Sequence, residues 1–215
     1  MADKGNSNAA NFEAVIGVTG CGKSTVLKKR IRKLPAAITN RSLIWSPKEA
    51  IDKYADFYPN SIVTSSAMEV LRILDKAGPK GKFHIVFVPT LDEKKDRDAF
   101  SVVCKIAIAS RNILFVVEEL HSVTQAGNAP HGWRLVNFMG RGFGLYVFGL
   151  SQRPASMDKA FLGSLSWLHV GELPHPPDQK VASQYLGVPM QEVAALCGYQ
   201  AIQKEFRTKK ITYVK

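Results

Sequence analysis

The sequence contains little cysteine and lacks the segments that direct a chain into or across a membrane. Its three cysteines, Cys21, Cys104 and Cys197, are odd in number and show no paired spacing, which argues against a disulfide framework or a zinc site. We therefore expect reduced thiols in an intracellular protein. No apolar run approaches the ~20 residues that span a bilayer. The polar segment 1–11 has no apolar centre, so it is not a signal peptide, and we expect it to form a disordered tail.

Acidic residues are scarce beside basic ones. The chain has 29 Lys and Arg against 18 Asp and Glu, which gives a net charge of +11 and a sequence pI of about 9.6. This balance favours a polyanionic partner such as nucleic acid, and it leaves open an anionic membrane surface or a basic protein with neither partner. The 215 residues, 46% hydrophobic and 22% charged, are enough for one globular domain, which we expect over 12–215.

A glycine-rich motif near the N-terminus is the strongest chemical signal. Residues 17–25 fit the P-loop pattern G-x-x-x-x-G-K-[ST] and read Gly17-Val18-Thr19-Gly20-Cys21-Gly22-Lys23-Ser24-Thr25. Glycines let backbone N–H groups approach the phosphates of a nucleotide closely. Lys23 can neutralise the outer phosphates, and the Ser24 hydroxyl can ligate Mg²⁺. The motif predicts that ATP and Mg²⁺ bind here.

The surrounding pattern alternates strands with helices. An apolar run at 14–16 precedes the P-loop and a helical pattern at 24–31 follows it. Later strands are predicted at 42–45, 61–64, 83–88, 113–117, 145–150 and 165–170, and later helices at 67–76, 92–111, 133–139, 179–186 and 190–196, with a loop at 122–130 and a terminal hairpin within 200–214. This order predicts an α/β P-loop NTPase fold with a mostly parallel sheet, helices on both faces and a C-terminal β-hairpin.

Two acids follow the most hydrophobic predicted strand. Glu118 and Glu119 come directly after 113–117, at the sheet edge where the P-loop also lies. We assign Glu118 to the Mg²⁺ shell, through water, and Glu119 to the general base or to positioning of the attacking water. An Asp is more usual at the first position. The alternative is a strand that simply ends in exposed acids.

The segment 144–156 resembles a known family. Its sequence, Gly-Leu-Tyr-Val-Phe-Gly-Leu-Ser-Gln-Arg-Pro-Ala-Ser, is similar to the strand and T-Q-R-P-S signature of the FtsK–HerA superfamily of DNA-pumping ATPases. The resemblance covers about 14–172 and implies a RecA/FtsK-like sheet. It implies that Gln152 senses the γ-phosphate. It also implies an arginine finger acting on a neighbouring subunit, for which Arg141 matches best and Arg153 is the second choice.

Within this superfamily the chain most resembles the genome-packaging ATPases of tailless icosahedral viruses with an internal membrane. It shows neither the membrane anchor of septal translocases nor the N-terminal barrel of HerA helicases, and the related filamentous-phage ATPases typically carry a transmembrane segment. The resemblance implies a homo-oligomeric ring, a hexamer, that pumps double-stranded DNA without reading its sequence. It further implies partners at a capsid vertex or in the membrane, and a location in the host cytoplasm or at the virion vertex.

Two other functions remain open from the residues alone. A nucleotide or small-molecule kinase has a similar P-loop and length, but it needs no acidic pair followed by a glutamine at a strand end. A nucleotide-dependent assembly scaffold needs no general base, and Glu119 argues against it. His121 directly follows the acidic segment, and we interpret it as local structure because a lone histidine is seldom catalytic.

Overall fold

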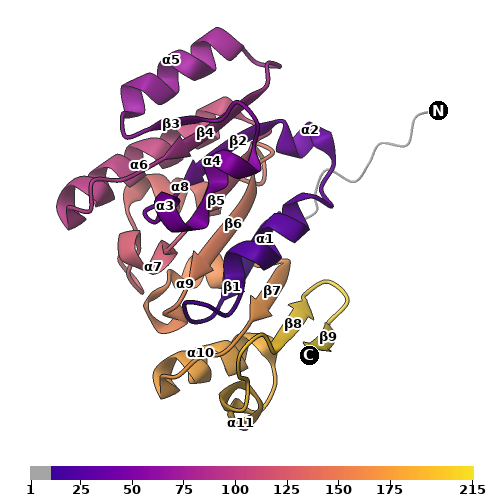
Figure 1. Cartoon of the computed structure of the whole chain (residues 1–215). Helices are drawn as coiled ribbons and strands as arrows, with labels where there is room; N and C mark the ends of the chain where they lie inside the picture. The colour runs from indigo at the N-terminus through magenta and orange to yellow at the C-terminus, as the bar shows by residue number, and fades with distance from the viewer. Residues whose placement is uncertain (1–10) are drawn as a thin grey trace.

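One mixed β-sheet runs through the computed structural model, which describes residues 11–215 (Figure 1). Across that range its nine strands lie in the order β3-β4-β2-β5-β6-β1-β7-β8-β9. All pairs from β3 to β7 are parallel, and the last two pairs are antiparallel. The strands are β1 Phe12–Ile16, β2 Arg41–Trp45, β3 Ile62–Thr64, β4 Phe83–Phe87, β5 Leu114–Val117, β6 Tyr146–Ser151, β7 Trp167–Val170, β8 Ala201–Glu205 and β9 Lys210–Val214.

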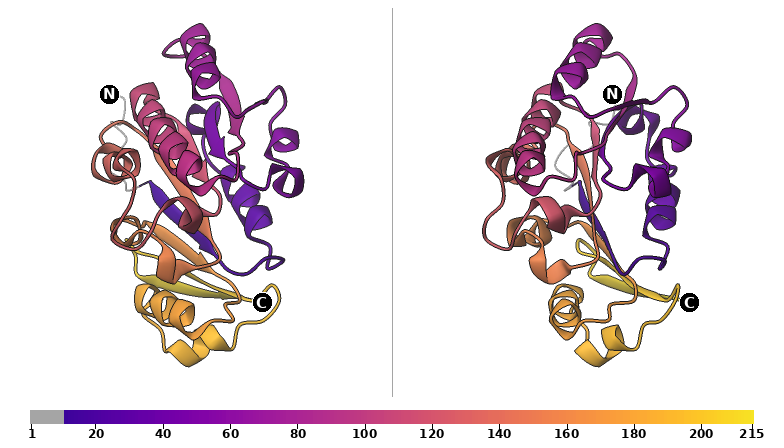
Figure 2. Two further views of the ribbon diagram at one scale, coloured as in Figure 1. Left: turned by 90° about the vertical axis from the view of Figure 1, so that its left-hand side faces the viewer. Right: turned by 60° about the vertical axis from the view of Figure 1, so that its left-hand side comes forward.

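Helices cover both faces of the sheet, as Figure 2 shows. The long helices α6 and α8 pack on one face, and α1 and α4 pack on the other. The helices are α1 Lys23–Ile31, α2 Ala36–Thr39, α3 Glu49–Asp52, α4 Tyr54–Phe57, α5 Ala67–Ala77, α6 Glu93–Ser110, α7 Leu120–Val123, α8 His131–Met139, α9 Lys159–Gly163, α10 Pro176–Leu186 and α11 Met190–Ala194, with a 3₁₀ turn at Pro154–Ser156.

The central strands are buried on both sides, which explains their nearly continuous apolar sequences. In β1, Ala14 and Ile16 join the core beneath α6 and α8, while Val15 between them joins the core beneath α1. Alternate residues of a strand point to opposite faces, so one strand serves both cores. The sheet is therefore held rigidly, and the ends of its parallel strands can position a site.

The predicted α/β fold, with helices on both faces and a C-terminal hairpin, is confirmed. The predicted loop at 122–130 is partly wrong, because α7 occupies Leu120–Val123. Helix α10 begins at Pro176, earlier than the predicted 179, since proline is well tolerated in the first turn of a helix. The short helices α2, α3, α4 and α9 were not predicted. The predicted N-terminal tail lies outside the described residues except for Asn11.

All three cysteines are free; Cys21 and Cys104 are buried and Cys197 is exposed. Within residues 11–215, none of the helices combines the length and the apolar character needed to cross a bilayer.

Candidate active site

The P-loop connects β1 to α1 at the carboxyl edge of the sheet. Gly22 has φ 86°, a left-handed conformation that favours glycine, and it caps the start of α1. The Nζ of Lys23 donates to the carbonyl of Val18 at 2.9 Å, so the lysine side chain folds back over the loop. The first N–H groups of a helix have no partner within the helix. The loop therefore presents backbone donors and a cation on the same side, which suits a polyphosphate.

Ser24 sits among carboxylates. Its Oγ donates to Asp52 Oδ1 at 2.8 Å and lies 3.5 Å from Glu118 Oε1. Glu118 also accepts a hydrogen bond from the hydroxyl of Tyr54, which is fully buried. Burial, reinforced by the nearby Asp52 carboxylate, raises the pKa of Glu118 to about 8. A cation bound here would offset that cost.

These oxygens fit a partial Mg²⁺ site. A hydroxyl and two carboxylates are the hard oxygen ligands that Mg²⁺ prefers. In the described part of the chain, no cluster of three or more His, Cys, Asp or Glu side chains could hold a metal ion alone. Ser24, Asp52 and Glu118 would therefore supply only part of the shell, with phosphate and water oxygens completing it, as is usual for Mg²⁺ at nucleotides.

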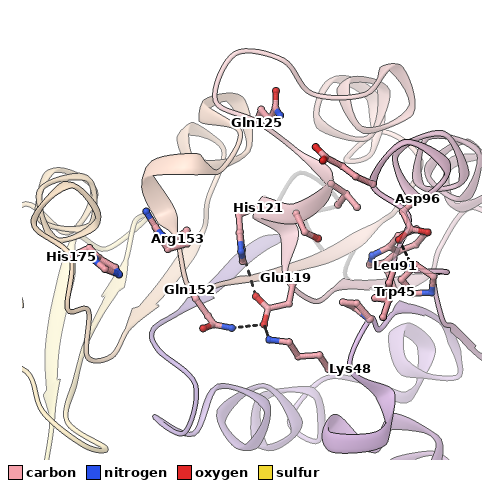
Figure 3. A pocket seen from close by; sticks show the side chains of 15 residues that line it. Trp45, Lys48, Leu91, Asp96, Glu119, His121, Gln125, Gln152, Arg153 and His175 are labelled. Carbon is pink, nitrogen blue, oxygen red and sulfur yellow. Dashed lines mark hydrogen bonds and ion pairs between the residues drawn. The ribbon is translucent and has the colours of Figure 1, made fainter.

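Glu119 points away from Glu118 because its backbone turns sharply. Its φ of 48° and ψ of 45° are left-handed, which is strained for a residue other than glycine. Figure 3 shows its carboxylate between Lys48, Gln152 and His121. Oε1 is ion-paired with Lys48 and accepts from Gln152 Nε2 at 2.5 Å, and Oε2 lies 3.5 Å from His121 Nδ1. This turn gives the two adjacent acids separate surroundings.

The charge state of Glu119 follows from these contacts. Burial works to raise its pKa, but the hydrogen bond and positive charge of Lys48, aided by Gln152 and His121, outweigh burial and lower it. Burial also lowers the pKa of His121, so the imidazole is mainly neutral at neutral pH. Glu119 is therefore an ionised carboxylate that can accept a proton.

Gln152 joins this acid to the P-loop. Its Oε1 accepts from the hydroxyl of Thr19 at 3.0 Å, while its Nε2 reaches Glu119. These side chains form a chain of contacts across four neighbouring strands. Its members lie just beyond the carboxyl ends of those strands: Lys48 after β2, Glu119 after β5, Gln152 after β6 and Thr19 after β1.

The two candidate arginines lie in different places. Arg153 lies beside the site in Figure 3; its Nε is 2.9 Å from Oδ2 of the fully buried Asp178, and its side chain is 48% exposed. Arg141 is exposed in the turn between α8 and β6, at the opposite end of β6 from Gln152. The six residues of β6 span on the order of 20 Å, so Arg141 is remote from the P-loop of its own chain.

The structure therefore brings together the P-loop, Glu118, Glu119, Gln152 and Arg153, but not Arg141. Sequence reasoning missed Lys48, Asp52 and Tyr54, and it set aside His121, which lies against Glu119. Lys48 offered one usable signal, since it closely follows a predicted strand. Asp52 and Tyr54 belong to short helices without a motif, so nothing in the sequence marked them.

Two openings flank Glu119. A cavity of ≈ 840 Å³ lies on its outer side, lined by Lys48, His121, Gln152 and Arg153 among others (Figure 3). A cavity of ≈ 420 Å³ lies over the P-loop, where Lys23 and Ser24 meet Glu118 and Glu119. The second is the place where bound phosphates would meet the acidic pair.

The parallel sheet and the glycine-rich loop at its carboxyl edge define an α/β P-loop NTPase fold. No family model and no curated protein matches the chain. The sulfate complex of the genome packaging NTPase B204 from Sulfolobus turreted icosahedral virus 2 is similar over 98% of this chain and 97% of its own, with a TM-score of 0.71 and 14% identity.

Two other solved structures are similar. B204, the DNA-packaging ATPase from Sulfolobus Turreted Icosahedral Virus, has a TM-score of 0.70 and 14% identity over 97% of this chain and 98% of its own. VirB4 of Thermoanaerobacter pseudethanolicus has a TM-score of 0.68 and 9% identity over 99% of this chain and 91% of its own. At 9–14% identity these likenesses show a shared fold, and they agree with the predicted P-loop NTPase fold.

Proposed function

We propose that the protein is an ATPase that translocates double-stranded DNA and packages a viral genome. The observation that carries this proposal is Gln152, which touches both Thr19 of the P-loop and the carboxylate of Glu119. A switch or scaffold that only binds nucleotide has no need of a base connected to the phosphate loop. The similar B204 structures, which include complexes with AMP, AMPPCP and ATP-gammaS, support ATP as the ligand.

We assign the following roles to the residues of the site. The P-loop holds the phosphates, and Lys23 exchanges the Val18 carbonyl for an outer phosphate oxygen. Mg²⁺, when bound, neutralises charge on the phosphates. Ser24, Glu118 and Asp52 are the residues that would hold it, with Glu118 acting through water. Such positioning and charge neutralisation account for most catalysis of phosphoryl transfer.

Glu119 would activate the water. The water oxygen attacks the γ-phosphorus, the bond to the β–γ bridging oxygen breaks, and the proton of the water passes to the Glu119 carboxylate. Gln152 fixes that carboxylate and can hydrogen-bond the γ-phosphate or the water. The lowered pKa of Glu119 keeps it ionised and able to accept the proton.

We further propose a ring, expected to be a hexamer, with an arginine from each subunit acting on its neighbour's nucleotide. Arg141 is exposed and remote from its own P-loop, which suits this role, whereas Arg153 is tied to Asp178 beside its own site. Partners at a capsid vertex or in the membrane, and a place in the host cytoplasm or at the virion vertex, follow from the same proposal.

Duplex DNA would be held through its phosphates. The net charge of +11 supports this, and Arg207, Lys209 and Lys210 are exposed on the β8–β9 hairpin. Lys204 is less available, because its Nζ donates to the carbonyl of Tyr185 at 2.8 Å. Contacts of this kind position DNA without reading its sequence.

The deciding experiment measures ATP hydrolysis with and without duplex DNA, alongside the size of the particle in ATP. We expect a DNA-stimulated ATPase that assembles into a ring, and Lys23→Ala as the control should lose turnover. DNA binding should weaken with salt, with a log–log slope of about −0.9 for each neutralised phosphate. Phosphorylation of a nucleoside monophosphate without DNA stimulation would identify a kinase instead. Nucleotide-dependent assembly without hydrolysis would identify a scaffold.

A further inference from the structure

A separate cavity of ≈ 580 Å³ opens beside the P-loop, between α1 and the C-terminal part of the sheet. Gly22 and Thr25 border it on the P-loop side, and Trp167, His169 and Gln203 border it on β7 and β8. Gly22, Thr25 and Tyr199 also line the cavity over the P-loop. The two cavities therefore meet at the first turn of α1, within reach of one extended ligand.

Tyr199 stands where the cavities meet. It lies in the loop between α11 and β8, and its side chain is 75% exposed. A Cβ added to Gly22 would lie 3.4 Å from the Cδ1 atom of the Tyr199 ring. An exposed aromatic ring held against the backbone of a phosphate-binding loop has no role in the core, but it offers a face for stacking.

The Tyr199 loop is tied to the P-loop through Glu172. The side chain of Glu172 accepts from the N–H of Gly198 at 2.8 Å, and its carbonyl accepts from the N–H of Val18 at 3.0 Å. Glu172 thereby links the loop that carries Tyr199 to the P-loop, where phosphates would bind. Such preorganisation favours a stacking contact, because less freedom is lost on binding.

The far wall of the cavity is polar. Burial lowers the pKa of His169 to about 4, so its imidazole is neutral at physiological pH. Gln203 Nε2 lies 3.1 Å from His169 Nδ1, so the amide and the imidazole are paired on this wall. The neutral imidazole and the amide offer donors and acceptors without charge. Trp167 is already covered by the guanidinium of Arg30, 4.1 Å from its ring centroid, which leaves Tyr199 to stack.

We propose that this cavity binds the nucleobase of the nucleotide whose phosphates lie in the P-loop, with Tyr199 stacked on the base and His169 and Gln203 hydrogen-bonding its edge. The inference rests on the proposed function only in that the P-loop holds phosphates, and it requires neither hydrolysis nor DNA. Its chemistry is that of a nucleoside triphosphate site, in which an uncharged planar ring lies beside a phosphate cradle. Lys29 and Lys33 on the rim could instead meet a nucleic-acid phosphate, and the experiment below separates the two.

The test compares ATP with inorganic tripolyphosphate, which has no base, as ligands of the full chain. Tyr199→Ala should weaken ATP binding roughly 5- to 100-fold, the range expected for loss of one base–aromatic stack. Tyr199→Phe, which keeps the ring, should bind ATP as the original chain does. Tripolyphosphate should bind all three proteins equally, and that equality also shows that the variants are folded.

Several results would overturn the proposal. One is that Tyr199→Ala loses the same affinity for ATP as for tripolyphosphate, and another is that its affinity for ATP is unchanged. A third is that the original chain binds ATP and tripolyphosphate equally tightly. A loss of duplex-DNA affinity as large as the loss for ATP would assign the cavity to nucleic acid instead. A chain that binds ATP with the expected dependence on Tyr199 but never hydrolyses it would contradict the proposed function and leave the base site standing.

Discussion

The side-chain amide of Gln152 donates to the carboxylate of Glu119 across 2.5 Å, although 33 positions separate the two residues in the sequence. The contact forms because β5 and β6 are neighbours in the sheet and both residues follow the ends of those strands. It places a candidate base and a candidate phosphate sensor in one unit. The consequences for activity can be measured one residue at a time.

The first prediction concerns the acidic pair. Glu119→Gln should bind ATP normally and hydrolyse it roughly 10²–10⁴-fold more slowly, the usual loss when a positioned base is removed. Glu118→Gln should instead raise the Mg²⁺ concentration needed for hydrolysis, because Glu118 lies 3.5 Å from Ser24 Oγ, the other proposed ligand. Single-turnover hydrolysis and Mg²⁺ titrations distinguish the variants. If Glu118→Gln alone blocks turnover and Glu119→Gln does little, the two roles are reversed.

The second prediction concerns Lys48, which contacts the carboxylate of Glu119. Lys48→Met should raise the pKa of Glu119, since Lys48 is the leading cause of its lowering. A base must be ionised to act, so the acid limb of the kcat/KM profile should move to higher pH. kcat should fall first at the acid end of the profile, where the raised pKa leaves more of Glu119 protonated. Lys94→Met, which removes an exposed lysine of α6, is the matched control. A profile that falls uniformly without a shift would give Lys48 only a structural role.

The third prediction concerns the arginines. Arg141→Ala and Lys23→Ala subunits should each be inactive alone, and mixed rings should recover part of the activity. Recovery is expected because some interfaces join an intact P-loop to an intact arginine, and an arginine finger is worth about 10³–10⁵ in rate. If rings shown to contain both subunits stay inactive, Arg141 does not act in trans. The same mixing with Arg153→Ala should give no recovery if Asp178 keeps Arg153 in its own site.

The fourth prediction concerns stability in acid. His169 has a folded pKa of about 4, below its ordinary value of 6.5, so the unfolded chain binds the extra proton first. The neutral buried imidazole therefore carries no penalty above pH 6.5. As the pH falls toward 4, the free energy of unfolding should decrease by up to about 3 kcal/mol. Urea unfolding at several pH values should show this loss, and His169→Gln should reduce it.

Two controls make that measurement specific. The other ionisable side chains lining the same cavity are Cys21, Lys29, Arg30, Lys33, Tyr199 and Lys215, and none of them is a carboxylic acid. Burial raises the pKa of Cys21, so its thiol stays neutral as the pH falls. His175→Gln changes an exposed histidine and should leave the acid dependence as it is. An acid loss of the same size in His169→Gln and in the original chain would contradict the assignment.

Local patterns predicted the framework of the site well. The P-loop fits a contiguous motif, Gln152 was found through the family resemblance of 144–156, and Glu118 was located because parallel strands end at one edge of a sheet. Such inferences need only the strands and their direction. The short helices α3 and α4 escaped because four residues hold too few periods to show a pattern.

Contacts made through turns and distant loops could not be predicted. Asp52 reaches Ser24, 28 positions away, and the Tyr199 ring reaches Gly22 from a loop near the other end of the chain. Whether the Glu119 carboxylate faces Ser24 or Gln152 depends on its left-handed backbone, and a glutamate in the sequence does not predict such a conformation. These details follow from packing of the whole chain.

The contact chain from Thr19 through Gln152 and Glu119 to Lys48 crosses the sheet at right angles to its strands. One end of this contact chain lies in the P-loop, which would bind a nucleotide, and the other end lies in the segment after β2. A displacement of Thr19 would be felt first by Gln152, then by Glu119 and Lys48, because these side chains contact one another directly. The ends of four strands would then respond together to a single phosphate group, and under the proposed function this linkage would couple a chemical step to movement elsewhere in the protein.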